Sequence, residues 1–473
     1  MASPEKFDAI IIGSGQAGTP LSTTLAEAGM RTALVERVHV GGTCVNEGCT
    51  PTKTMVASGR VAYLARRAAD YGVQTGSIGI DLRRVRERKR QIVDKFRNGS
   101  QARMERTANL ELIFGTARFT APKTVEVKLK DGGVRSLTAE NIFINAGTRA
   151  SRPKLDGVDD VPTLDNASIM ELDTVPEHLL ILGGGYIGLE FGQLFRRFGS
   201  RVTIFQMDGQ LLTHEDPDIA DEVAKILRED GIEVLLDAHV TRVSKAGGNI
   251  QIEFERKAAQ DEHGGTKAVT VTGSHLLLAT GRTSNSDTLN LAAGGIEADD
   301  RGFIKVNDRL ETTAEGVYAL GDIKGGPAFT HISYDDFRII RSNLLEKKNA
   351  SIRNRVVPYT LFIDPQLGRV GLTEKEAREQ KRNIRVAMLP MTAVARALET
   401  DESRGFMKAV VDADTNQILG AAVLGIEGGE VMAAFEVAMM GKLPYTALRD
   451  GVFAHPTLVE SLNNLFTAMD KGK

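Results

Sequence analysis

The chain has 473 residues, enough for about three domains of roughly 150 residues each. Its charged content of 26% and net charge of −3 give it no general attraction to nucleic acid or anionic membranes. Two cysteines are too few for a disulfide-stabilised secreted scaffold, and neither a secretory signal nor a membrane-spanning apolar run is visible. We therefore expect a cytoplasmic protein with no nucleic-acid or membrane partner.

The chain begins with the pattern of a nucleotide-binding βαβ unit. The apolar run Phe7–Ile12 predicts a buried parallel strand, and a glycine-rich loop follows at residues 13–18. A helix is expected from Thr19 to Glu27, and a second strand, Thr32–Glu36, completes the unit.

A cysteine pair follows, within residues 41–53. On a regular helix, Cα atoms five residues apart lie roughly 8–9 Å from each other, whereas a disulfide needs less than about 7 Å. Cys44 and Cys49 can therefore bridge only where the helix is distorted, which Gly48 and Pro51 would tolerate. A helix that begins here would stabilise a thiolate through its dipole, so we interpret the pair as chemically active.

The middle of the chain adds helical and strand patterns. Residues 60–106 are expected to be largely helical, and residues 110–145 to form short strands with a turn at Asp131–Gly133. Residues 256–266 have the character of a polar hairpin tip. Six basic residues near residue 85 are interpreted as a solvated helix face and not as a nucleic-acid site: Arg83, Arg84, Arg86, Arg88, Lys89 and Arg90.

The βαβ pattern then repeats. Leu179–Leu182 is the expected strand, residues 183–188 the loop, Leu189–Phe198 the helix and Arg201–Gln206 the next strand. From residue 355 onward, three strand-like segments precede a helix pattern at Gly429–Met440, which indicates a separate α+β domain. The three segments are Tyr359–Ile363, Gly405–Val411 and Ile418–Val423.

Both loops have the spacing Gly-x-Gly-x-x-Gly. The first glycine permits a tight turn, the second lets a pyrophosphate approach, and the third lets the helix pack on the strand. Glu36, at the end of the first copy, suits a ribose 2′-hydroxyl, whereas Gln206 in the second can hydrogen-bond a hydroxyl and does not repel a 2′-phosphate. The choice between NADH and NADPH stays open. The glycines are Gly13, Gly15 and Gly18, then Gly183, Gly185 and Gly188.

The string Gly-Gly-Thr-Cys-x4-Cys-x3-Lys, with the ordered motifs from about Lys6 to Phe466, resembles the class I pyridine nucleotide-disulfide oxidoreductases. These flavoproteins include dihydrolipoamide dehydrogenase, glutathione reductase and mercuric reductase. The resemblance implies an α/β fold with two Rossmann-like domains, for FAD and NAD(P), and a C-terminal α+β dimerisation domain of a homodimer. The expected segments are 1–150 (FAD, first part), 151–281 (NAD(P)), 282–350 (FAD/central, second part) and 351–473 (dimerisation).

The resemblance also implies the cofactor-binding residues. Asp322, in a string similar to the family's second FAD motif, would hold the ribityl chain, and Gly115 would lie near the adenine. The other expected FAD residues are Gly13, Gly15, Gly18, Glu36, Gly42, Thr43, Lys53, Ala146, Gly147 and Ala328. For NAD(P)H they are Gly183, Gly185, Tyr186, Gly188, Gln206 and Gly281.

The catalytic roles follow from the same resemblance. Cys49 would face the flavin as a thiolate and Cys44 would attack the substrate, with Lys53 near flavin N5 and paired with Glu190. No resident metal is expected.

A histidine near the C-terminus completes the implied set. His455 would act as acid and base, oriented by Glu460, toward the cysteines of the other subunit. A histidine near its ordinary pKa can serve both steps of thiol–disulfide exchange.

Within the family, two segments resemble the mercuric-reductase-like flavoproteins, a group that includes reactive-chlorine-resistance copper reductases. They are residues 326–331 and 455–466. The tail, Ser461–Lys473, lacks the cysteine pair of mercuric reductases, which argues against efficient mercuric reduction. Glu47 places a negative charge between the cysteines, which would either disfavour anionic acceptors or point to solvent.

Three hypotheses remain. The first is an NAD(P)H-dependent reductase of a small acceptor, namely a disulfide, a metal ion or a quinone. The second is dihydrolipoamide dehydrogenase. The third, of a different class, is a flavin-based redox sensor with little turnover.

Overall fold

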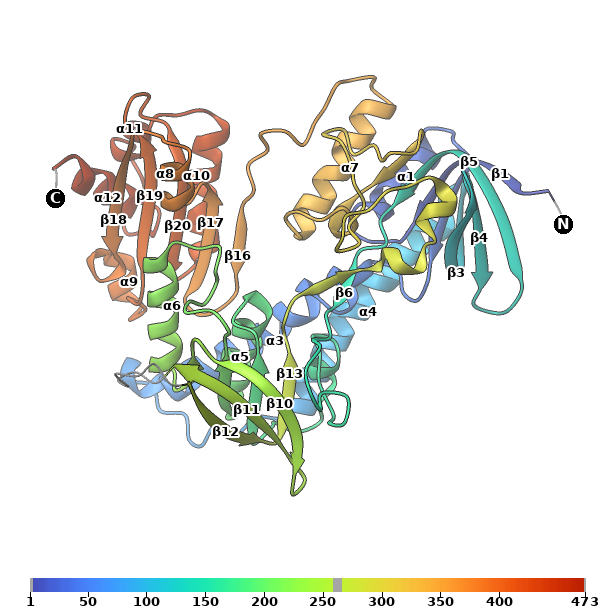
Figure 1. Ribbon diagram of the computed structural model, residues 1–473. Helices are drawn as coiled ribbons and strands as arrows, with labels where there is room; N and C mark the ends of the chain where they lie inside the picture. Colours follow the sequence, from blue (N-terminus) through green and yellow to red (C-terminus); the bar gives the residue numbers. More distant parts are fainter. Residues whose placement is uncertain (1–2, 258–265, 472–473) are drawn as a thin grey trace. The chain divides into compact units, whose positions relative to one another are not determined.

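The computed structural model describes residues 3–257 and 266–471 (Figure 1). The chain forms two compact units, each assembled from three separate segments. The first unit contains Met1–Met55, Arg83–Ser151 and Gly281–Arg355, and the second contains Val56–Leu82, Arg152–Thr280 and Val356–Lys473. The assignment of FAD, NAD(P) and dimerisation domains to particular segments stays a prediction.

The first unit is built on a mixed sheet whose central strands are parallel. Its strands are β1 (Glu5–Ile12), β2 (Thr32–Glu36), β3 (Leu110–Ala121), β4 (Thr124–Leu129), β5 (Val134–Ile144) and β15 (Val317–Ala319), and a small pair is formed by β6 (Thr148–Ala150) and β14 (Arg282–Ser284). Its helices are α1 (Gly18–Glu27), α2 (Gly42–Asn46), α4 (Leu82–Arg106), α7 (Thr330–Leu344) and the start of α3 (Cys49–Arg66). Short 3-10 turns are η3 (Asn285–Thr288), η4 (Leu291–Gly294) and η5 (Gly321–Lys324).

Parallel pairing gives the strand order β3–β2–β1–β5–β15. Side chains alternate along β1: Ala9 and Ile11 pack among α1, α4 and α7, whereas Ile10 and Ile12 pack on the opposite face, against β4 and the segment around η4. The predicted strands Phe7–Ile12 and Thr32–Glu36 are confirmed.

β3 changes partner in the middle. Its first half, through Phe114, pairs in parallel with β2, and its second half, from Gly115, pairs antiparallel with β4. Gly115 is therefore the first residue past the parallel sheet, directly after Phe114, which pairs with Glu36. The strands are longer than expected from sequence, but the turn at Asp131–Gly133 is confirmed.

The second unit repeats this plan. The parallel sheet β9–β8–β7–β13 consists of β7 (His178–Leu182), β8 (Arg201–Phe205), β9 (Glu233–Leu235) and β13 (His275–Leu278). The helix α5 (Tyr186–Phe198) packs on β7 and β8, and α6 (Pro217–Glu229) on β9. An antiparallel sheet of β10 (His239–Ala246), β11 (Asn249–Lys257) and β12 (Thr266–Gly273) accompanies it. The predicted βαβ repeat is thus confirmed, because β7, α5 and β8 follow one another as β1, α1 and β2 do.

The C-terminal segment of this unit is an antiparallel sheet with helices, as the change of sequence pattern predicts. Its strands lie in the order β16 (Tyr359–Leu361), β17 (Gln366–Gly371), β20 (Ile418–Gly425), β19 (Phe406–Asp412) and β18 (Ile384–Pro390) (Figure 1). Phe435 and Phe466 meet in its core at 6.1 Å between ring centroids. The helices are α8 (Glu374–Glu379), α9 (Ala395–Glu399), α10 (Gly428–Met440), α11 (Tyr445–Arg449) and α12 (Ser461–Asp470), and the remaining turns are η1 (Ala68–Tyr71), η2 (Ser168–Glu171) and η6 (Met391–Ala393).

The helical region 60–106 is interrupted between α3 and α4. Gly72 and Gly76 have φ of +75° and +68°, which an α-helix cannot contain. The prediction of a solvated basic face is wrong at one residue, because the Lys89 side chain is only 3% exposed. Leu82, Lys89 and Val93 share one stripe of α4 at helical spacing, and that stripe faces the interior.

The expected hairpin tip at residues 256–266 falls largely on residues 258–265, which lie outside the described residues. In the part of the chain that the structure describes, no helix has the length and apolar character needed to cross a membrane.

The second glycine loop yields a stability prediction. A Cβ on Gly188 would lie 2.1 Å from the Gly183 carbonyl oxygen, whereas a Cβ on Gly185 would meet no atom within 4 Å. Gly188→Ala should therefore destabilise the protein by about 1–3 kcal/mol through overpacking, and Gly185→Ala should stay within about 0.5 kcal/mol of the wild type. Thermal unfolding of both variants measures the difference; equal melting temperatures would contradict the packing role of Gly188.

Candidate active site and dinucleotide loops

The cysteines lie on either side of a break between two helices. Cys44 is in α2 and is partly buried, and Cys49 is the first residue of α3 and is exposed; neither is in a disulfide. A Cβ on Gly48 would lie 2.9 Å from the Thr43 carbonyl oxygen and 3.2 Å from the Cys44 Cα. Only glycine lets the backbone pass Cys44 this closely. The predicted distortion is therefore confirmed.

The two thiols differ in how readily they lose a proton. The pKa of Cys44 is raised, first by its hydrogen bond with Cys49, then by burial and by the negative charge of Cys49. Cys49 stands at the N-terminus of α3, where the helix dipole favours an anion. Its sulfur lies 3.3 Å from the hydroxyl oxygen of Thr330, the first residue of α7. This arrangement suits a thiolate at Cys49 beside a protonated Cys44.

Glu47, between the cysteines, is exposed at the C-terminal end of α2. Of the two sequence alternatives, the structure favours the side chain that points to solvent.

The first glycine loop is held by the carboxylate at the end of β2. Glu36 accepts hydrogen bonds from the Ser14 N–H at 3.0 Å and hydroxyl at 2.6 Å, and from the Val38 N–H at 2.8 Å. The backbone of Gly42 also approaches this loop, since a Cβ there would lie 2.7 Å from the Gly15 Cα. Two bare glycines in contact leave no side chain over the loop. A pyrophosphate therefore has access to the backbone at the N-terminus of α1, and the residues present fit a dinucleotide.

Asn145 also supports this loop, a role that was not predicted from the sequence. With its amide oxygen turned toward the loop, it accepts from the N–H groups of Gly15 and Gly18 at 3.2 and 3.1 Å. Its nitrogen then donates to the Leu320 carbonyl oxygen at 3.2 Å. Leu320 directly precedes the turn that carries Asp322, so one amide joins the first loop to that turn. The signal in the sequence is a polar residue directly after an apolar strand.

A buried acid holds the Asp322 turn. Asp336 has no exposed surface; it accepts from the Gly321 N–H at 2.8 Å and pairs with Lys324 at 3.3 Å and Arg355 at 2.7 Å. Asp322 itself accepts from the Thr148 hydroxyl at 3.1 Å. The sequence signal for Asp336 is an acid in the apolar stripe of α7, at helical spacing between Ile332 and Ile340.

The second glycine loop repeats the hydrogen bond of the first. Gln206, 9% exposed, accepts from the Gly184 N–H at 2.8 Å, as Glu36 accepts from Ser14 in the first copy. Its nitrogen donates to Asp208 at 2.8 Å. Gly185 directly precedes α5, and a Cβ added to it would meet no atom within 4 Å. This loop also fits the pyrophosphate of a dinucleotide.

The remaining expected cofactor residues of the first unit lie in loops, apart from Thr43. Ala146 accepts from the Asn285 amide at 2.8 Å, and Gly281 accepts from the Ser151 N–H at 2.9 Å. Ala328 is exposed, ahead of α7. Thr43 is in α2, and Gly147 follows Ala146 with φ of +65°. Their contacts with a cofactor stay predictions.

The expected pair of Lys53 and Glu190 stays a prediction as well, because Lys53 belongs to the first unit and Glu190 to the second. Glu190 is buried in α5 and accepts from the Phe362 N–H at 2.9 Å.

His455 and Glu460 are brought together in the C-terminal segment. His455 Nδ1 lies 2.9 Å from one Glu460 carboxylate oxygen and 3.1 Å from the other. The His455 side chain is 68% exposed. A carboxylate on Nδ1 fixes the ring and leaves Nε2 directed outward for proton transfer.

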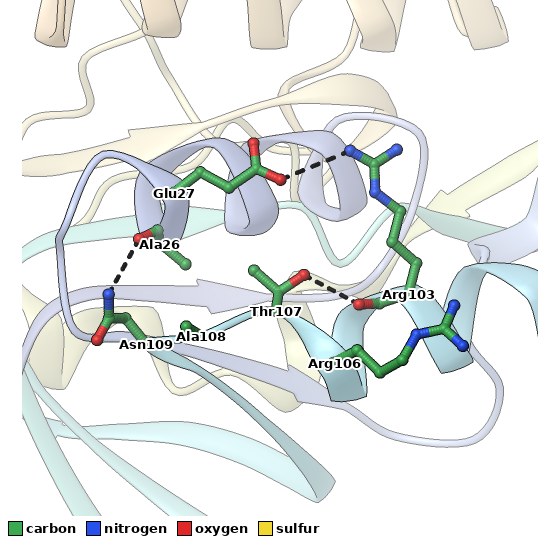
Figure 2. Close-up of a pocket in the computed structure, with 7 residues that line it drawn as sticks. All are labelled: Ala26, Glu27, Arg103, Arg106, Thr107, Ala108 and Asn109. Atoms are coloured by element: carbon green, nitrogen blue, oxygen red, sulfur yellow. Dashed lines mark hydrogen bonds and ion pairs between the residues drawn. The ribbon is translucent and has the colours of Figure 1, made fainter.

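One surface hollow of about 410 Å³ lies elsewhere, at the C-terminal ends of α1 and α4 (Figure 2). Glu27 and Arg103 form an ion pair across it at 3.8 Å. It lies at the opposite end of α1 from the glycine loop and contains neither cysteine. We assign it no part in the site.

Comparison with known proteins identifies the family. The chain matches the model of the pyridine nucleotide-disulphide oxidoreductases over residues 7–336 and the model of their dimerisation domain over residues 357–466. It is 39% identical to the probable pyridine nucleotide-disulfide oxidoreductase RclA of Escherichia coli, over 98% of this chain and 99% of the relative. It is 34% identical to a mercuric reductase of Bacillus cereus, over 98% of this chain and 72% of the relative.

The fold is similar to the solved structure described as the Cu(II) complex of HOCl-induced flavoprotein disulfide reductase RclA from Escherichia coli. The TM-score is 0.88 at 38% identity, over 98% of this chain and 99% of that one. The chain therefore belongs to the pyridine nucleotide-disulfide oxidoreductases, flavoenzymes that use FAD and NAD(P)H.

Proposed function

We propose that this enzyme carries electrons from NAD(P)H to the Cys44–Cys49 pair, which then reduces a small disulfide, metal-ion or quinone acceptor. The observation that carries the proposal is the cysteine pair itself. Its two thiols are hydrogen-bonded across a helix break, and one of them stands at a helix N-terminus.

The two glycine loops bind the cofactors in this proposal. The first loop, with Glu36, Gly42, Asn145 and Asp322, holds FAD, and the second, with Gln206, holds NAD(P)H. When bound, FAD supplies two-electron transfer between the nicotinamide and the cysteine pair.

The cysteines then act in sequence on a disulfide acceptor. The Cys44 thiolate attacks one acceptor sulfur and the other leaves as a thiolate that takes a proton, giving a mixed disulfide. The Cys49 thiolate then attacks the Cys44 sulfur, and the second acceptor sulfur leaves as a thiolate that takes a proton from solvent, which restores the Cys44–Cys49 disulfide. The pKa of Cys44 is raised while Cys49 is charged, so a base must remove the Cys44 proton before Cys44 can attack the acceptor.

His455 is the group we assign to that proton. In a homodimer, which the matched dimerisation domain supports, His455 of the partner subunit would take the proton of Cys44 and return it to the leaving thiol. Glu460, 2.9 Å from Nδ1, holds the ring in place for this transfer.

Among the acceptors, a thiophilic metal ion has specific support. The related flavoprotein has been solved as a Cu(II) complex. In a balanced reaction, two Cu(II) ions each take one electron from the reduced pair, whose Cys44 thiol and Cys49 thiolate become the disulfide and release one proton. Among the described residues, no group of three or more His, Cys, Asp and Glu side chains forms a metal site, so the ion would be bound as a transient substrate.

A panel of acceptors tests the proposal. Purified protein with bound flavin should oxidise NAD(P)H faster when Cu(II), a low-molecular-weight disulfide or a quinone is added. Fast NAD⁺ reduction by dihydrolipoamide would assign the protein to dihydrolipoamide dehydrogenase instead. Flavin reduction without turnover on any acceptor would favour the redox sensor.

The two cysteines give a matched pair of variants. Cys44→Ser should retain FAD and its reduction by NAD(P)H but lose turnover with a disulfide, because the attacking sulfur is gone. It should also show long-wavelength thiolate–flavin absorption from Cys49, whereas Cys49→Ser should not. Steady-state rates and absorption spectra measure both; retained disulfide turnover in Cys44→Ser would reverse the assigned roles.

The histidine is tested with a disulfide acceptor. His455→Ala should slow turnover roughly 10²–10⁴-fold, the usual cost of losing a general base, while flavin reduction by NAD(P)H stays fast. His239→Ala, which removes an exposed histidine at the start of β10, is the control and should match the wild type. An unchanged rate in His455→Ala would remove this residue from the mechanism.

A further inference from the structure

A buried carboxyl that the proposed mechanism does not use lies between β8 and α6. Glu215 is 4% exposed. One of its oxygens accepts a hydrogen bond from the Tyr359 hydroxyl, and the other lies 3.3 Å from the Arg369 guanidinium. Tyr359 is on β16 and Arg369 on β17, so this acid is held by the first two strands of the C-terminal sheet.

The backbone joins Glu215 to the second glycine loop. The Glu215 N–H donates to the Leu212 carbonyl oxygen at 2.8 Å, and the Leu212 N–H donates to the Gly184 carbonyl oxygen at 3.2 Å. Leu211 also covers Gly184, since a Cβ there would lie 2.5 Å from a Leu211 methyl carbon. The segment that carries Glu215 therefore packs directly on the loop.

The side chains provide a second connection. The Tyr359 ring lies 5.4 Å from the Tyr186 ring, centroid to centroid, at an angle of 56°. Tyr186 is the first residue of α5 and stands inside the Gly-x-Gly-x-x-Gly sequence. The pKa of Tyr186 is raised by burial and then by the charge of Glu215, so the two groups interact electrostatically.

Glu215 changes charge near neutral pH. Burial raises its pKa to about 7, and the nearby carboxylates of Asp216 and Glu376 add to this, while Arg369 opposes it. Lys408 neutralises Asp216 at 3.2 Å. The ionised acid would sit beside the N-terminus of α5, the end that binds a negatively charged pyrophosphate.

We propose that Glu215 is a positioning residue for the nicotinamide dinucleotide, which holds Tyr359, and through it Tyr186, beside the second glycine loop. The inference rests on the proposed binding of NAD(P)H at that loop. Ionisation of Glu215 places a negative charge near an anionic ligand, so the affinity for NAD(P)H falls as the pH rises.

Glu215→Gln tests this directly, because it keeps the size and an acceptor oxygen but cannot ionise. Anaerobic flavin reduction at increasing NADH or NADPH concentration yields an apparent Kd and a limiting rate. In the wild type, the Kd should rise roughly three- to tenfold from about pH 6 to about pH 8.5, as expected for one charge near an anionic ligand. In Glu215→Gln the Kd should stay at the low-pH value, with a limiting rate close to that of the wild type.

Two further variants serve as a control and as a second test. Glu222→Gln, on α6 and paired with Lys225 at 2.9 Å, is a matched control that should follow the wild-type profile. Tyr359→Phe removes one hydroxyl and should flatten part of the profile. A rising Kd in Glu215→Gln, or a flat one in the wild type, would overturn the inference. Wild-type flavin that NAD(P)H fails to reduce at every pH would contradict the proposed function itself.

Thermal unfolding checks independently that Glu215 titrates. Its pKa is about 7 in the folded protein against an ordinary 4.5, so the folded state holds the proton more tightly. The wild type should therefore lose stability relative to Glu215→Gln as the pH rises from 4.5 to about 7, and the difference should be constant above that. A melting-temperature difference that does not change with pH would show that Glu215 keeps one charge state.

Discussion

The cysteine site depends on a close backbone contact at Gly48. The chain leaves α2 and begins α3 within three residues, and any side chain at Gly48 would press on the Thr43 carbonyl and on Cys44. That contact replaces a continuous helix, in which the two sulfurs would be too far apart, with two helices that meet at the sulfurs. The same break gives Cys49 a helix N-terminus, so geometry and thiolate stabilisation have one cause.

Both dinucleotide loops are held by the same kind of hydrogen bond. In each copy a polar side chain at the end of the second strand accepts an N–H from the loop, through Glu36 in the first and Gln206 in the second. The loop is thus shaped before any ligand binds, and binding does not have to order it. Asn145 and Asp336 extend this support to the Asp322 turn, which comes from a distant part of the sequence.

Features based on local patterns were predictable from the sequence. The apolar runs of β1 and β7, the glycine spacings and the need for a distorted helix at Cys49 all depend on neighbouring residues. Lys89 was misplaced because charge was given more weight than its helical position in line with Leu82 and Val93. The roles of Asn145, Asp336 and Glu215 depend on partners 12 to 175 residues away, or on burial that sequence alone does not reveal. The contacts between the loop residues and the cofactors were implied by family resemblance and stay predictions.

In the proposed function, the flavin and the cysteine pair form one chain of electron carriers. An anaerobic titration of the oxidised enzyme with NADH or NADPH, followed by the flavin spectrum, measures whether electrons pass from one to the other. Each subunit should take up one hydride equivalent for the cysteine pair, with long-wavelength thiolate–flavin absorption, and a second that bleaches the flavin. Complete bleaching after the first equivalent, without the long-wavelength band, would show that electrons stop at the flavin and would contradict the proposed function.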